Sequence, residues 1–230
     1  MLQPISNDFK VDVVLCLEAT EATRPFSSTV KEVAKAFPER LLDASEMRGK
    51  PITGLRMRVI AFRRIGTDSD PIRESRFFVL PEEAEAYCDF IDSITFSGQS
   101  LPSGLEAIAR ALASDFVTEG RILRHCVWMI SPSAAAALGT GAESPDYPAA
   151  MPADLDALCA RWEMGDEAAP AYCPRRGRLL LYTADQAFWA PLECWNRYWP
   201  IYAKDSEELG TVLADGEAWD AVFDLLVGGY

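Results

Sequence analysis

A short apolar run near the start of the chain constrains the fold more than any other feature of the sequence. Residues 13–17 (VVLCL) are all apolar and begin with two β-branched valines, which suits a strand rather than a helix. A strand that is apolar on both faces is typical of the centre of a parallel sheet with helices on both sides. Ligands of such sheets bind beyond the carboxyl ends of the strands, so Glu18, Thr20 and Glu21 are candidate site residues.

Further patterns predict the rest of an α/β fold. Other strands are expected at residues 55–62, 76–80, 126–130, 178–183 and 197–202. Apolar spacings of three and four predict helices at residues 24–42, 81–94, 105–116, 152–162 and 219–226. Pro38 falls inside the first helical pattern, so we expect it to interrupt or end that helix. A turn joins the second and third strands, which indicates one antiparallel edge strand on a mostly parallel six-stranded sheet.

The length and net charge of the chain limit the classes of protein to which it can belong. The chain has 230 residues, of which 49% are hydrophobic, enough to fill one large α/β core. We expect a loose arm at residues 1–10 and a single domain over residues 11–230. The formal net charge of −13 opposes binding to nucleic acid or to an anionic membrane surface. Since the sequence also lacks a membrane-spanning run and a signal peptide, we expect a cytoplasmic protein.

The cysteines and the single histidine are expected to be structural. The six cysteines form no Cys-x-x-Cys pair, and Cys16 and Cys126 fall in predicted strands, where a reduced thiol packs as a small apolar group. His125 begins a predicted strand and is the only residue that could serve Ser-His-Asp chemistry. An enzyme would instead need a pair of carboxylates such as Glu18 and Asp185, and no substrate suggests itself.

Several segments together resemble the von Willebrand factor A family, and in particular its stand-alone bacterial branch. In these segments a strand ends at an acidic residue and hydroxyls, and a hydroxyl-bearing glycine loop precedes a helix. They are residues 11–20, 94–98, 103–107, 147–148 and 151–152, with Trp162. The resemblance covers nearly the whole chain from Val11 onward and implies a Rossmann-like sheet with helices on both faces. It also implies a protein partner, because this branch is associated with MoxR-type AAA+ ATPases in bacterial conflict or stress systems.

The same resemblance implies a metal-ion-dependent adhesion site that has lost ligands. In the family, Mg²⁺ is held by Asp-x-Ser/Thr-x-Ser on the first loop, a Thr or Asp on the second, and an Asp after the fourth strand. The matching positions here are Glu18, Thr20, Ala22, Ser100 and Pro132, so two of them lack a side-chain oxygen. One carboxylate and neutral hydroxyls offer little charge to offset dehydration of the ion. We therefore predict a degenerate site and no cofactor.

Two functions remain open at this stage. The first is a non-catalytic interaction module that binds its partner through the loops at the carboxyl ends of the strands. Its predicted contact residues are Glu18, Thr20, Glu21, Gln99, Ser100, Ser131 and Ser133. The second retains Mg²⁺ on Glu18, Thr20, Ser100 and waters, and binds its partner through the ion. A purely structural role, in which these side chains cap loops and bind backbone N–H groups, is the alternative to both.

Aromatic residues are concentrated between Phe188 and Tyr202. Tryptophan and tyrosine are common anchors of protein interfaces, but they also fill cores and cover edge strands. The sequence leaves both roles open for this segment.

Overall fold

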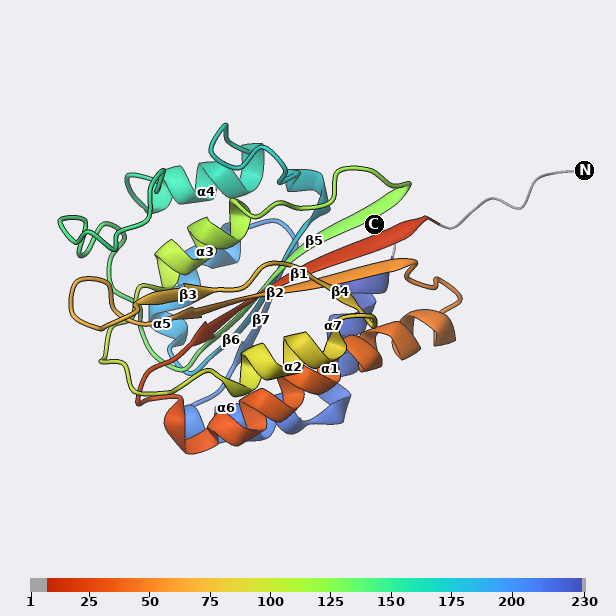
Figure 1. Ribbon diagram of the computed structural model, residues 1–230, viewed down its shortest axis with the longest axis horizontal. Coiled ribbons are helices and arrows are strands. Elements are labelled where there is room, and N and C mark those ends of the chain that lie inside the picture. Colours follow the sequence, from red (N-terminus) through yellow and green to blue (C-terminus); the bar gives the residue numbers. More distant parts are fainter. Residues whose placement is uncertain (1–7, 229–230) are drawn as a thin grey trace, which may run out of the picture.

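The computed structural model describes residues 8–228, apart from the side chains of Glu193, Cys194 and Glu217, and arranges them around one central sheet (Figure 1). The strands are β1 (Phe9–Glu18), β2 (Gly54–Phe62), β3 (Ile72–Glu74), β4 (Phe78–Leu80), β5 (Ile122–Ser131), β6 (Gly177–Thr183) and β7 (Tyr198–Tyr202). The α-helices are α1 (Ser27–Met47), α2 (Ala84–Asp92), α3 (Gly104–Leu112), α4 (Leu155–Met164), α5 (Gln186–Trp189), α6 (Ser206–Ala214) and α7 (Gly216–Val227). Short 3-10 turns are η1 (Arg24–Phe26), η2 (Pro174–Arg176) and η3 (Ala190–Cys194).

The predicted central strand lies at the centre of the sheet. β1 pairs in parallel with β2 on one side and with β5 on the other, and the path continues through β6 to β7. Val14, for example, lies between Arg58 and Val127 in register. The mostly parallel α/β sheet is therefore confirmed. β1 begins at Phe9, two residues before the expected start, and residues 1–7 of the predicted arm lie outside the described residues.

The antiparallel edge is confirmed, but it is divided in two. β3 and β4 both run antiparallel to β2, each along a different part of it, so the described sheet has seven strands at six positions. Ser75 lies between them and exchanges two hydrogen bonds with Val59. Its backbone N–H donates to the Val59 carbonyl, and its hydroxyl, rather than its carbonyl, accepts from the Val59 N–H, each at 2.9 Å. This side-chain bond interrupts the ladder just before the strand predicted at residues 76–80. That strand corresponds to β4 alone, and β3 was not predicted.

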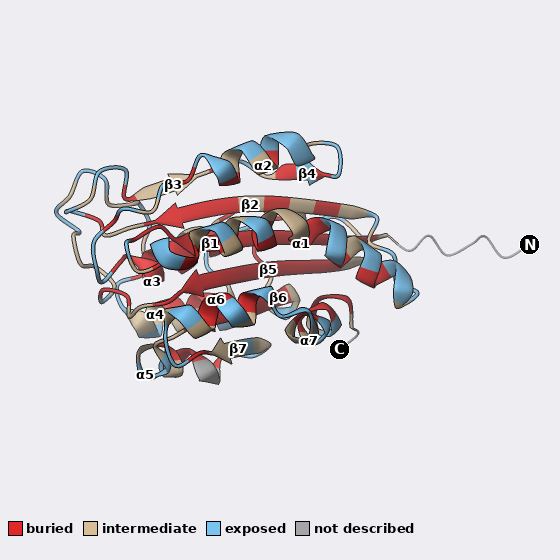
Figure 2. Cartoon of the chain, turned by 90° about the horizontal axis from the view of Figure 1, so that it is seen from below, coloured by how far each residue is buried: buried red, intermediate tan, exposed pale blue. Residues whose placement is uncertain are grey.

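Helices cover both faces of the sheet and create two cores (Figure 1). α1, α2, α6 and α7 pack on one face, where Val13 and Leu15 of β1 point, and α3 and α4 pack on the other, where Val14 and Cys16 point. Figure 2 shows β1 and β5 buried along their length between helices that expose their outer sides. Successive side chains of β1 point to opposite faces of the sheet, and helices cover both faces. Residues 13–17 are therefore apolar without a break.

The prediction that Pro38 interrupts the first helix is wrong. α1 continues through Pro38 to Met47, and Pro38 is buried. A proline removes the N–H that would bond to the carbonyl four residues earlier, which here belongs to Ala34. The Tyr87 hydroxyl of α2 donates to that carbonyl at 2.8 Å, so the acceptor is satisfied and the helix is not broken.

The histidine and the strand cysteines have structural roles. His125 is fully buried and stacks on Phe116, with ring centroids 4.5 Å apart. Its Nε2 lies 3.0 Å from the Val117 carbonyl, and its Nδ1 accepts from the Cys173 N–H at 3.2 Å. Burial lowers the pKa of His125 to about 4, so the neutral ring is the stable form. Cys16 and Cys126 are buried free thiols, in agreement with the expected reduced state.

No helix between residues 8 and 228 combines the length and apolar character needed to cross a membrane.

Candidate functional site

The loops that follow the carboxyl ends of the parallel strands lie together at one end of the sheet. We call this end the crown and define it by residues 19–23, 63–71, 95–103 and 132–138. The first loop bonds to the third, because Thr20 forms a parallel bridge with Gly98 and the N–H groups of residues 97 and 98 donate to the Ala19 carbonyl at 3.2 Å. The crown is therefore built on the ends of β1, β2 and β5.

A buried carboxylate lies at the centre of the crown. Glu18 has no exposed surface, and its oxygens accept hydrogen bonds from three hydroxyls. The hydroxyls of Thr20 and Ser133 lie 2.5 Å from Oε1, and that of Ser131 lies 2.7 Å from Oε2. The Ser133 backbone N–H adds a longer bond of 3.4 Å to Oε2. We call Glu18, Thr20, Ser131 and Ser133 the hydroxyl cluster.

No ion pair within residues 8–228 involves Glu18, so these donors alone replace the water that burial removes. A hydrogen bond to a charged acceptor is stronger than one between neutral groups, so three hydroxyls can effectively replace the water around the Glu18 carboxylate. The fold brings them together because β1 and β5 are parallel neighbours whose ends coincide. Trp189 fixes the crown loop at residues 132–138 by donating from Nε1 to the Ser133 carbonyl at 3.2 Å.

Arg63 and Asp68 hold the other crown loops in place. The Arg63 guanidinium donates to the carbonyl and hydroxyl of Thr95 at 2.8 Å and to the Ala19 carbonyl at 3.3 Å. The Asp68 carboxylate accepts from the N–H of Gln99 at 3.1 Å. Side chains of the β2 loop thus fix the loop that carries two predicted site residues.

The predicted site residues divide into two groups. Glu18, Thr20 and Ser131, which are buried, form the hydroxyl cluster with the half-buried Ser133, whereas Glu21, Gln99 and Ser100 are exposed on the crown surface. Glu21 pairs with Arg24 at 3.0 Å. No hydrogen bond described for residues 8–228 joins Ser100 to Glu18.

The donor set of the hydroxyl cluster does not fit Mg²⁺. This ion prefers an octahedron of oxygens and is usually held through carboxylates, and the cluster offers one carboxylate whose two oxygens already accept four donors. Among the described residues no group of three or more histidine, cysteine, aspartate or glutamate side chains could hold a metal. Asp185, the second carboxylate considered for catalysis, caps α5 by accepting from the Phe188 N–H at 3.0 Å.

Sequence reasoning missed a second buried carboxylate beside the crown. Glu106 is fully buried in the first turn of α3, and burial raises its pKa. Its Oε1 accepts from the Gly139 N–H at 2.9 Å and from the Tyr147 hydroxyl at 3.4 Å. It therefore anchors the long loop between β5 and α4. An acidic residue in the first turn of a helix normally complements the helix dipole. The sequence around Glu106 therefore gave no indication that its carboxylate is buried and anchors a loop.

An apolar hollow of about 430 Å³ opens next to this loop. Its wall includes Leu105, Leu138, Leu155, Phe188, Trp189 and Leu192. The aromatic segment thus contributes both to the core and to a surface, because Trp189 is buried while Trp199 is 40% exposed.

The fold is similar to that of solved chains that include a von Willebrand factor type A protein. The pilus adhesin SpaC from Lactobacillus rhamnosus GG matches with a TM-score of 0.54 and 10% identity over 95% of this chain and 31% of its own. A von Willebrand factor type A protein from Catenulispora acidiphila has a TM-score of 0.54 and 10% identity over 93% and 43%. Proximal thread matrix protein 1 from the mussel byssus has a TM-score of 0.55 and 13% identity over 96% and 49%.

The chain thus spans between about a third and a half of the length of these solved chains. At such low identity the likeness defines the fold alone, and it confirms the fold implied by the sequence resemblance. No protein-family model matches the sequence, and no curated protein matches it.

Proposed function

We propose that this chain is a non-catalytic interaction module that binds a protein partner through its crown, without a bridging divalent ion. The observation that carries the proposal is the state of Glu18, whose carboxylate is buried and bound by the chain's own hydroxyls. In this role the hydroxyl cluster is structural, and its hydrogen bonds hold the loops after β1 and β5 together. The exposed residues Glu21, Gln99 and Ser100 then form the binding surface.

The composition of the crown supports a protein as the partner. Ala137 and Leu138 of the crown line the apolar hollow beside Trp189, and other crown residues are exposed and polar. Protein interfaces combine an apolar centre with a polar rim. The similar solved chains include a pilus adhesin, in which the matching part is about a third of a longer chain. A module that works by contact within a larger assembly is the function we infer from this arrangement.

For the identity of the partner we propose a MoxR-type AAA+ ATPase or another protein encoded in the same operon of a bacterial conflict or stress system. The sequence resemblance to the stand-alone bacterial branch supports this partner. The high acidity of the chain, with a formal net charge of −13, favours a partner with a basic surface.

A pull-down from the native host tests the proposal. The tagged chain, a Gln99→Arg/Ser100→Arg crown variant and a Glu163→Arg control are used as baits, each with and without EDTA. Glu163 is exposed at the end of α4 and is not a crown residue. We expect the chain and the control to capture an AAA+ or operon-encoded protein, the crown variant to lose it, and EDTA to have no effect. Capture that EDTA abolishes would instead support the Mg²⁺-dependent alternative on Glu18, Thr20 and Ser100.

A further inference from the structure

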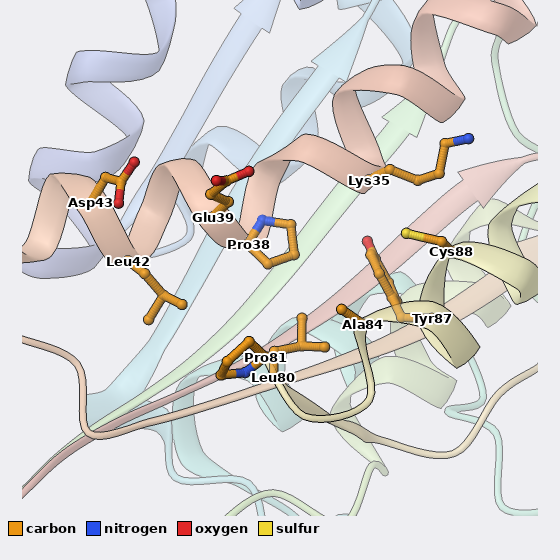
Figure 3. A pocket seen from close by; sticks show the side chains of 10 residues that line it. All are labelled: Lys35, Pro38, Glu39, Leu42, Asp43, Leu80, Pro81, Ala84, Tyr87 and Cys88. Atoms are coloured by element: carbon orange, nitrogen blue, oxygen red, sulfur yellow. The ribbon is translucent and has the colours of Figure 1, made fainter.

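A second hollow, of about 410 Å³, lies between α1 and α2, on residues that do not belong to the crown. We call it the α1–α2 groove. Figure 3 shows Pro38 and Leu42 of α1 facing Leu80, Pro81 and Ala84 across it. The hydroxyl of Tyr87, at its inner wall, is already bonded to Ala34. The groove therefore presents aliphatic carbon to an incoming group and offers few free polar atoms.

The α1 side of the groove is acidic. Glu39 and Asp43 line the groove and are exposed on α1, and Glu82 and Glu85 are exposed next in sequence to the lining residues Pro81 and Ala84. None of these four takes part in an ion pair among residues 8–228. Lys35 is the basic residue of the lining, and its amine is paired with Asp92 at 2.9 Å. The unpaired carboxylates of Glu39 and Asp43 on the α1 side attract a cationic partner.

The neighbouring sheet edge is closed to an added strand. On β4, the Val79 N–H donates to the Glu83 carboxylate at 2.7 Å, and the Val79 carbonyl accepts from the Glu83 N–H at 2.8 Å. The backbone groups that strand addition would need are therefore occupied. Side chains that enter the groove do not need these backbone groups, and an amphipathic helix binds in this way.

The exposed apolar surface continues beyond the groove. Met47 lies one helical turn after Asp43 on the same side of α1 and is 80% exposed. Single exposed apolar residues are normal on protein surfaces. Met47, however, follows the groove along α1 and therefore lengthens the apolar surface that a partner could contact.

We propose that the α1–α2 groove docks a basic amphipathic helix of a partner protein. A bulky apolar side chain of that helix fills the space between Pro38 and Ala84, and its lysine or arginine side chains pair with Glu39 and Asp43. This surface is independent of the crown, so the module can contact two parts of one assembly.

The test uses a synthetic amphipathic peptide of leucine and lysine, about 18 residues long so that it can form a helix. A leucine–glutamate peptide of the same pattern is the charge control. Binding is measured by fluorescence anisotropy of the labelled peptide, and its location by amide NMR shifts. Two groove variants are compared, Ala84→Trp, which fills the hollow, and Glu39→Lys/Asp43→Lys, which reverses the rim charge. The control variant, Glu163→Lys/Glu167→Lys, makes the same change of net charge at exposed residues elsewhere.

We expect the leucine–lysine peptide to shift the amides of residues 38–43 and 80–88. Both groove variants should weaken its binding about tenfold or more, as loss of an interface anchor does, while the control variant binds like the wild type. The charge-reversal variant keeps the test valid even if Ala84→Trp does not fold. The proposal is overturned if the peptide fails to bind at about 1 mM. Shifts that map elsewhere, or a control variant that weakens binding as much as the groove variants, would overturn it equally.

Discussion

The Tyr87 hydroxyl donates a 2.8 Å hydrogen bond to the Ala34 carbonyl oxygen. This carbonyl is the one that Pro38, four residues later in α1, cannot bond, because proline has no N–H. A side chain of α2 therefore completes the hydrogen bonding of α1, and it does so at the inner wall of the α1–α2 groove. A buried acceptor left unpaired would be costly, which gives the pair Tyr87 and Ala34 a measurable role.

Tyr87→Phe should lower the free energy of unfolding by about 1–2 kcal/mol, since it leaves the Ala34 carbonyl buried without a donor. In a Pro38→Ala background the new N–H of residue 38 can bond to that carbonyl. The cost of Tyr87→Phe should then fall to about 0.5 kcal/mol or less. Urea denaturation of the four proteins of this cycle measures the coupling, and equal costs in both backgrounds would refute the assignment.

Folding stability should depend on the protonation of His125. Its pKa is about 4 in the folded chain and near 6.5 when exposed, because burial disfavours the charged ring. A lowered folded pKa means that the unfolded chain binds more protons between these values. The contribution of His125, about 3 kcal/mol, is thus complete above pH 6.5 and is lost as the pH falls towards 4.

His125→Gln should remove this part of the pH dependence, whatever its effect on stability at pH 8. Denaturant titrations of both proteins at pH 8, 6, 5 and 4 give the difference directly. Parallel curves for the wild type and the variant would show that the ring does not titrate in this window.

Gly104 is held in a crowded position under the crown. A Cβ atom there would lie 3.0 Å from the ring of Trp189 and 3.2 Å from the Cβ of Ala135, which has no flexible part to move away. Gly104→Ala should therefore destabilise the chain by about 1 kcal/mol, although alanine is the better helix former. Gly216, also the first residue of a helix, has no atom within 4 Å of such a Cβ.

Gly216→Ala should therefore be neutral or stabilising by up to about 1 kcal/mol. Thermal denaturation of the two variants distinguishes crowding from helix propensity. If both substitutions stabilise the chain equally, the crown is less tightly packed than described.

The hydroxyl cluster should contribute strongly to stability. Glu18→Ala leaves three hydroxyl donors without their acceptor, and we expect a loss of about 2–4 kcal/mol. Ser133→Ala removes one donor and should cost about 1 kcal/mol, because Thr20 and Ser131 still bind the carboxylate. Chemical denaturation measures both values, and a Glu18→Ala protein as stable as the wild type would exclude the structural role.

The sequence predicted the features that depend on local pattern. The central position of β1 followed from its unbroken apolar run, and Glu18 and Thr20 were identified because they directly follow that strand. It did not predict features that depend on distant partners. The donor that satisfies the helix around Pro38 comes from Tyr87, and the split of the edge strand depends on a bond between Ser75 and Val59.

The candidate site also combines features that follow from local sequence pattern with features that depend on distant partners. Ser131 and Ser133 were identified as contact residues because they follow the predicted fourth strand, but their bonds to Glu18 depend on the pairing of β1 with β5. Ser100 was grouped with Glu18 by analogy with the family, whereas the loop places it at the surface. Loop paths of this kind are set by contacts such as that of Asp68 with Gln99, which a one-dimensional pattern does not reveal.

Calorimetric titration of the chain with Mg²⁺ and Mn²⁺ tests the central claim, that the crown works by contact without an ion. We predict no heat beyond dilution and no change in Tm up to about 10 mM of either ion. A site with a Kd near 1 mM would add about 1.4 kcal/mol at that concentration, and the Tm would rise by about 3–5 °C. Saturable one-to-one binding that Thr20→Ala abolishes would contradict the claim.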